Sequence, residues 1–279
     1  MKRPHYKTHR AFTLMELLVV IAILGILAAL LLPALSKARQ HAWSVTCLAN
    51  QKQLVAAWMM YADEHNGRIP RSTCHSSDSW RIQATEVTNV PPPGLDPLAT
   101  AIWQAQEGYK QGALYSYAQD PKIIHCPGDP RPRPATSFDD PGYDSYSIPE
   151  GLNSVSSRYQ PILKHSEIAH TSARYVFVEE FDPRGDNKSS WQLVDTGPLA
   201  DYQGSSWIDS PAVFHGRSSS FAWADGHASN RRWVEIDTVK FAASRDWTKF
   251  NHDPDPPDNA DIIFIATGFP FLRDDGGNP

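Results

Sequence analysis

Two histidines and an aspartate near the C-terminal end of the chain are the residue types best suited to chemistry. Nine residues separate His215 from Asp225, Gly226 follows directly, and His227 stands two positions after Asp225. Residues two apart on a strand share a face, so Asp225 and His227 could offer a carboxylate and an imidazole together. These donors suit zinc or iron. No further ligand accompanies them, so we interpret the element as structural and metal-free, with Asp225 and Gly226 in a hairpin turn and His215 capping a neighbouring strand.

A second group of possible metal ligands, made of oxygen donors, lies within residues 182–187. Asp182, Asp186 and Asn187 carry the carboxylate and amide oxygens that calcium prefers. Their spacing does not match an EF-hand, and these residue types are common in turns, so we expect a loop and keep calcium as an alternative. A solvated acidic loop is expected closer to the C-terminus, where four more aspartates stand: Asp253, Asp255, Asp258 and Asp261.

The composition and the motifs argue against an enzyme. The sequence contains no P-loop, no nucleophile elbow and no dinucleotide-binding fingerprint. A net charge of −5 gives no basic surface for nucleic acid. With 23 prolines and 9 tryptophans among 279 residues, the chain is typical of a loop-rich exported domain. We therefore expect no catalytic residues, no cofactor and no nucleic-acid partner.

The N-terminal segment favours a membrane anchor. Basic residues in positions 1–10 precede an uncharged apolar run over 17–32, and with its flanks this stretch nears the ~20 residues that span a bilayer. A secretory signal peptide cut after Ser36 and a plain single-pass anchor are two interpretations. Glu16 favours a third, a prepilin signal. A carboxylate inside an apolar run is costly, so it indicates a function and a partner.

Residues 11–29, which read AFTLMELLVVIAILGILAA, resemble the processing signal of type IV prepilins. The resemblance implies that a prepilin peptidase cuts between Ala11 and Phe12 and methylates the new amine of Phe12. It implies that Glu16 pairs with this amine in a neighbouring subunit during assembly, and that Pro33 kinks the helix. Ala11 departs from the family, which usually has glycine there.

A wider resemblance reaches a branch of type IV pilin-like proteins and type II secretion pseudopilins with a C-terminal H-X9-DG motif. It rests on segments 47–54 and 61–70, on the stretch at 126–129, which resembles a Cys-Pro-Ser-Asp element of that branch, and on the element from His215 to Gly226. The implied function is a fibre subunit, with other subunits, the peptidase, an inner-membrane assembly platform and membrane lipid as partners. The N-terminus would be cytoplasmic and the large domain periplasmic. A membrane-anchored periplasmic hydrolase or binding protein is the alternative.

The resemblance also bears on which of the three cysteines form a disulfide. Export would place all three in an oxidising compartment, where disulfides persist. The sequence alone leaves all three pairings open. Cys47 and Cys126 lie in segments that resemble the family, and Cys74 does not. A Cys47–Cys126 disulfide is therefore the expected pairing, and the role of Cys74 stays open.

The predicted fold is α+β: one long N-terminal helix packed on an antiparallel β-sheet. We expect a leader over 1–11, a transmembrane half-helix over 12–35, an amphipathic half-helix over 36–66 and a globular domain over 67–279. The helix should end near Asn66-Gly67, a C-terminal capping signal. Further predicted elements are helices within 97–118 and 236–247, and strands at 175–181, 213–214, 220–224, 227–234 and 261–266.

Overall fold

The computed structural model describes residues 14–131, 142–154, 160–181, 190–194, 206–244, 252–254 and 258–270. The chain divides into two compact units, residues 1–42 and 43–279. The leader and the predicted cleavage site lie outside the described residues, as do Asp182, Asp186 and Asn187.

Helix α1, Leu14–Glu64, runs without interruption through Pro33. Within the described residues, one helix is long and apolar enough to cross a membrane, and it is α1. Its apolar side chains from Leu14 to Leu35 are exposed. The chain leaves the helix through Asn66 and Gly67, whose φ angles of 56° and 79° are left-handed, so the predicted end of the helix is confirmed to within two residues. A kink at Pro33 stays a prediction.

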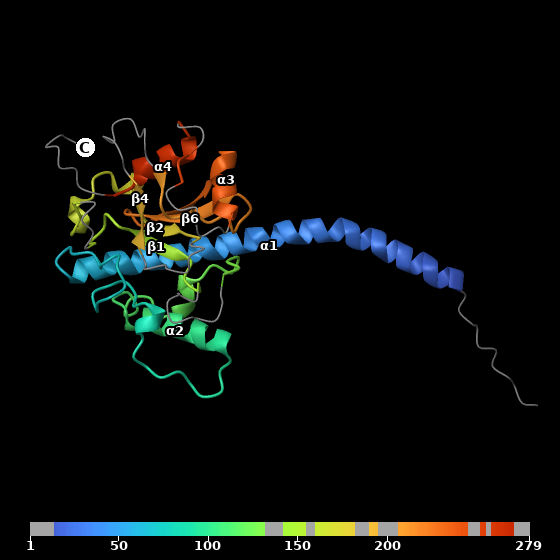
Figure 1. Ribbon diagram of the computed structural model, residues 1–279, viewed down its shortest axis with the longest axis horizontal. Coiled ribbons are helices and arrows are strands. Elements are labelled where there is room, and N and C mark those ends of the chain that lie inside the picture. Colours follow the sequence, from blue (N-terminus) through green and yellow to red (C-terminus); the bar gives the residue numbers. More distant parts are fainter. Residues whose placement is uncertain are drawn as a thin grey trace, which may run out of the picture. The chain divides into compact units, whose positions relative to one another are not determined.

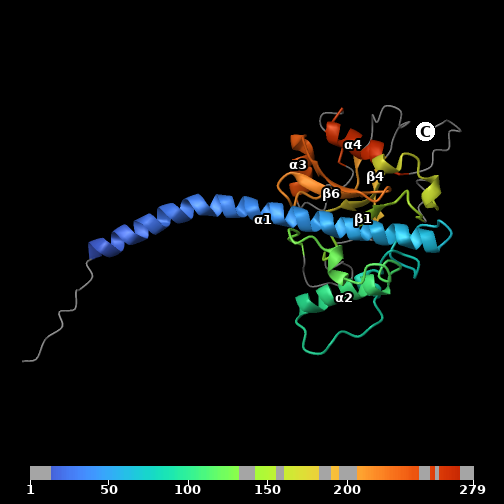
Figure 2. The ribbon, with the colours of Figure 1, turned by 180° about the vertical axis from the view of Figure 1, so that it is seen from behind.

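Within the second unit, α1 buries one stripe of side chains and exposes the rest. Cys47, Gln51, Leu54 and Trp58 are fully buried and recur at three- and four-residue steps. Figure 1 shows this half of α1 running between the sheet and the segment that holds α2 (Pro97–Gln111), and Figure 2 shows the same order from behind. The expected amphipathic half-helix that carries a sheet is confirmed.

The main sheet has five strands in the order β3-β1-β2-β6-β7. Its pairs are antiparallel except β1 with β3, which is parallel, so the sheet is mixed and the all-antiparallel prediction is wrong at that edge. A two-stranded sheet pairs β4 with β5. The strands are β1 Tyr146–Pro149, β2 Tyr175–Glu179, β3 Ser190–Trp191, β4 Leu193–Val194, β5 Ser206–Trp207, β6 Ser218–Trp223 and β7 Ala228–Arg232.

Strand β2 is buried on both faces, which explains its continuous apolar sequence. Its register against β6 shifts between Tyr175 and Phe177, the mark of a β-bulge. Val176 and Phe177 consequently both join the core under α1, whereas Tyr175 and Val178 join a second, aromatic core with the C-terminal helices. Beyond the bulge the alternation resumes, so Glu179 faces the α1 side with Phe177.

The C-terminal helices cover the other face of the sheet (Figure 1). They are α3, Ile236–Ala243, and α4, Ala260–Gly268. The prediction of a strand at 261–266 is wrong: Asn259 caps α4 by accepting hydrogen bonds from the N–H groups of Asp261 and Ile262. The predicted strand at 213–214 is also wrong, because that segment enters a turn before β6. Short 3₁₀ turns complete the fold at Ala84–Glu86, Pro121–Ile124, His165–Glu167 and Thr171–Ala173. The α+β class is confirmed.

Candidate functional site

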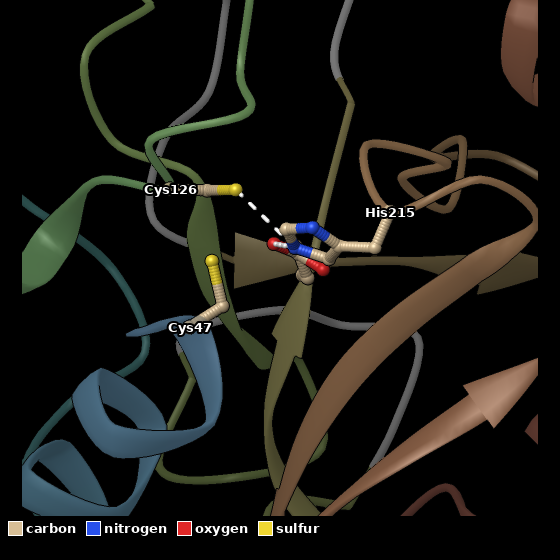
Figure 3. A group of neighbouring side chains, drawn as sticks. Cys47, Cys126 and His215 are labelled. Atoms are coloured by element: carbon tan, nitrogen blue, oxygen red, sulfur yellow. Dashed lines mark hydrogen bonds and ion pairs between the residues drawn. The ribbon is translucent and has the colours of Figure 1, made fainter. Parts of the chain in front are cut away.

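Four buried side chains, one of them from α1 and three from other segments, converge on the buried side of α1. We call them the Cys–Glu–His cluster: Cys47, Cys126, Glu179 and His215. One ligand-type atom of each residue lies within 4.8 Å of the corresponding atom of every other. Figure 3 shows the two sulfur atoms and the ring of His215 pointing toward one another. Cys47, Cys126 and Glu179 are 0% exposed, and His215 is 8% exposed.

The turn after the 3₁₀ segment Pro121–Ile124 positions Cys126. Its backbone N–H donates to Oγ of Ser145 at 3.0 Å, and that hydroxyl donates to Asp129 at 2.7 Å. The backbone N–H of Gly128 donates to the sulfur of Cys126 at 3.3 Å. The sulfur is therefore held by the local backbone rather than by apolar packing alone.

Glu179 and His215 form the charged side of the cluster. Nε2 of His215 lies 3.0 Å from Oε1 of Glu179 and 3.4 Å from Sγ of Cys126. The other carboxylate oxygen, Oε2, accepts a hydrogen bond from the backbone N–H of Ser220 at 2.9 Å. Oγ of Ser218 donates to the carbonyl of His215 at 2.8 Å and fixes the turn that carries the ring.

The proton equilibria of the cluster are linked. Hydrogen bonding from the Cys126 thiol lowers the pKa of Cys47 despite the opposing effect of burial. Burial and the bond to Cys47 raise the pKa of Cys126. Burial alone would lower the pKa of His215, but the sulfur of Cys47 and the carboxylate of Glu179 raise it to about 10. The arrangement thus favours a thiolate on Cys47 and positive charge beside it.

The alternative of a metal group formed by His215, Asp225 and His227 is not what the structure assembles. His215 lies in the Cys–Glu–His cluster, whereas Asp225 and His227 pair with each other at 2.6 Å in an exposed position. The turn itself is confirmed: Asp225 accepts the backbone N–H of His227, and Gly226 has a φ of 90°.

Glu179 is the residue that the motifs missed. The signal in the sequence was a carboxylate closing a strand that is otherwise apolar. A charge in a strand buried on both faces needs a partner, but its partners come from positions far away in the chain.

The two cysteines predicted to pair do lie in one cluster, and no disulfide joins any two of the three cysteines, all of which belong to the described residues. Cys74 is buried elsewhere, with its sulfur 3.8 Å from Oε1 of Gln83. The Cys47–Cys126 disulfide stays a prediction.

The predicted acidic loop is wrong for one of its members. Asp261 is completely buried in the first turn of α4. Asp253 and Asp258 are exposed as expected, and Asp255 lies outside the described residues.

Comparison with known families gives one match, at the N-terminal end. Residues 6–32 carry the prokaryotic N-terminal methylation motif. The match spans the predicted cleavage site between Ala11 and Phe12, together with Glu16, and supports a type IV pilin-like family. It also fits a single-pass membrane anchor formed by α1. No curated protein matches the chain, and no solved structure does.

Proposed function

We propose that the chain is a structural subunit of a type II secretion pseudopilus or a type IV pilus-like fibre. The observation that carries this proposal is the N-terminal methylation motif at 6–32, which leads directly into α1. Proteins with this motif are typically processed subunits that assemble with others of their kind. The α+β architecture, with a sheet on the second half of the long helix, agrees with a pilin-like fold.

In this proposal a prepilin peptidase cuts between Ala11 and Phe12 and methylates the amine of Phe12. Glu16 of one subunit then pairs with that amine on its neighbour. An ammonium and a carboxylate attract strongly in an apolar medium, and their pairing offsets the cost of removing both from water. The remaining proposed features are a cytoplasmic N-terminus, a periplasmic globular part and an inner-membrane platform that assembles the fibre.

The H-X9-DG element acts in this proposal as structural support for the subunit. Its histidine is buried against Glu179 and its Asp225-Gly226 pair forms the β6–β7 turn. Both ends of the motif therefore have a place in the fold, which supports assignment to the branch that shares it.

The decisive test is the mass of the mature N-terminal peptide after co-expression with a prepilin peptidase. A terminus at Phe12 carrying one added methyl group is expected. Ser36→Leu removes the alternative secretory cleavage site and should change nothing, whereas Ala11→Lys should block cutting. An intact Met1 terminus, or a terminus at Lys37, would refute the proposal.

A further inference from the structure

The Cys–Glu–His cluster has the donor set of a closed metal site. It offers two sulfurs, one imidazole nitrogen and one carboxylate oxygen, all buried and all within 4.8 Å of one another. Thiolate and imidazole ligands suit zinc, and four protein ligands are the usual number in structural zinc sites. The donors come from α1, the turn after Ile124, β2 and the turn before β6, so the fold itself brings them together.

We propose that the Cys–Glu–His cluster binds a zinc ion that ties α1 to the sheet. This site goes beyond the proposed role as a fibre subunit. It replaces two expectations from the sequence, a metal-free chain and a Cys47–Cys126 disulfide.

The distances agree with tetrahedral coordination. Zinc bonds of ~2.0 Å to nitrogen or oxygen and ~2.3 Å to sulfur place neighbouring ligand atoms about 3.3–3.8 Å apart. Nε2 of His215 is 3.4 Å from Sγ of Cys126, within that range, and 3.0 Å from Oε1 of Glu179, slightly below it. No pair exceeds 4.8 Å, so side-chain shifts of about 1 Å suffice to complete the geometry.

The surrounding hydrogen bonds are those that a metal site needs. The N–H of Ser220 occupies Oε2 of Glu179 and leaves Oε1 directed at the cluster. The N–H of Gly128 points at the sulfur of Cys126, where it would offset negative charge on a thiolate ligand. Such partners orient ligands and tune their affinity.

The complete set of buried donors favours a metal ion over a disulfide at this position. Glu179 and His215 lie beside the two sulfurs, and polar side chains are retained in a core where they have partners. A disulfide between Cys47 and Cys126 would be neutral and would use the sulfurs alone. A divalent ion would use all four donors, including the carboxylate and imidazole that the disulfide leaves unexplained. With every position taken by protein, the site is structural rather than catalytic.

The test is the metal content of the full-length protein, purified in detergent without chelator and without a histidine tag. Elemental analysis by mass spectrometry should find zinc stoichiometric with the chain. The Cys47→Ser, Cys126→Ser and His215→Gln variants should each bind zinc at least about ten-fold more weakly. Cys74→Ser is the matched control, because it removes a buried thiol outside the cluster, and it should retain full zinc content.

Cobalt substitution of the wild-type chain keeps the proposal testable if a variant fails to fold. Reduced, metal-stripped protein given Co²⁺ should develop thiolate-to-cobalt absorption and the visible bands of a tetrahedral site, and Zn²⁺ should displace them. Absence of both zinc and cobalt binding by folded, reduced wild-type protein would overturn the proposal. A Cys47–Cys126 disulfide in the protein as isolated, shown by peptide mapping, would overturn it in favour of the oxidised pair.

Discussion

Replacing Asp261 should reveal how strongly one buried carboxylate stabilises the C-terminal part of the fold. Asp261 is 0% exposed. It accepts hydrogen bonds from the backbone N–H of Val234 at 3.0 Å and from that of Glu235 at 2.9 Å. The guanidinium of Arg231 approaches it at 3.2 Å. These contacts fasten α4 to the segment between β7 and α3.

The Asp261→Asn variant keeps the shape of the side chain but loses its charge. The amide nitrogen must replace one acceptor, so at least one buried donor is left facing another donor. A lost charge-assisted bond together with an unsatisfied buried donor costs about 2–4 kcal/mol in unfolding free energy. Urea unfolding of the detergent-solubilised protein, followed by tryptophan fluorescence, measures this directly, with an unchanged m-value as the sign of a pure stability effect.

Asp258→Asn is the matched control, since Asp258 is exposed and stands three positions away. Its effect should stay within about 0.5 kcal/mol. If Asp261→Asn costs no more than this control, the carboxylate does not fasten α4 and the reasoning fails.

Three further predictions follow from other positions. Glu16→Leu should leave membrane insertion intact but reduce crosslinked oligomers in membranes, and equal ladders would argue against an assembly role. Gly112→Ala should destabilise by about 1–3 kcal/mol in urea unfolding, because a Cβ there would lie 2.5 Å from the Trp80 carbonyl oxygen, whereas Gly25→Ala meets nothing within 4 Å and should not destabilise. Burial alone would raise the pKa of Asp225, but hydrogen bonds from His227 lower it overall. Wild type should therefore be more stable than Asp225→Asn at neutral pH, and this difference in unfolding free energy should vanish as pH falls through the lowered pKa of Asp225. A pH-independent difference would contradict this.

The sequence predicted those parts of the fold that local patterns determine. The long apolar helix, its end at Asn66-Gly67 and the β6–β7 hairpin each follow from residues that are neighbours in the chain. The strand predicted at 261–266 failed because a short buried apolar run has the same appearance as helix or strand. The capping residue Asn259 was the signal that separates the two.

For the Cys–Glu–His cluster, the sequence indicated single members but not the complete set. The family resemblance joins Cys47 to Cys126, but no pattern in the sequence adds His215 to them, and Glu179 looks like an ordinary strand residue. Their meeting depends on the β2 bulge and on the packing of α1, which are properties of the tertiary structure. Sequence spacing cannot report a site whose donors lie in four different elements.

The contacts that hold α1 on the sheet also set the order of events during synthesis. Gln51 donates to the carbonyl of Ser220, 169 residues later, and Asn230 donates to Ser44 across 186 residues. The apolar stripe of α1 is therefore made early, but the strands that cover it emerge from the ribosome only near the end of translation. Contacts so distant in sequence slow folding, and uncovered apolar surface promotes aggregation. The nascent chain should thus depend on chaperones or on rapid delivery to the membrane until β6 and β7 have been made.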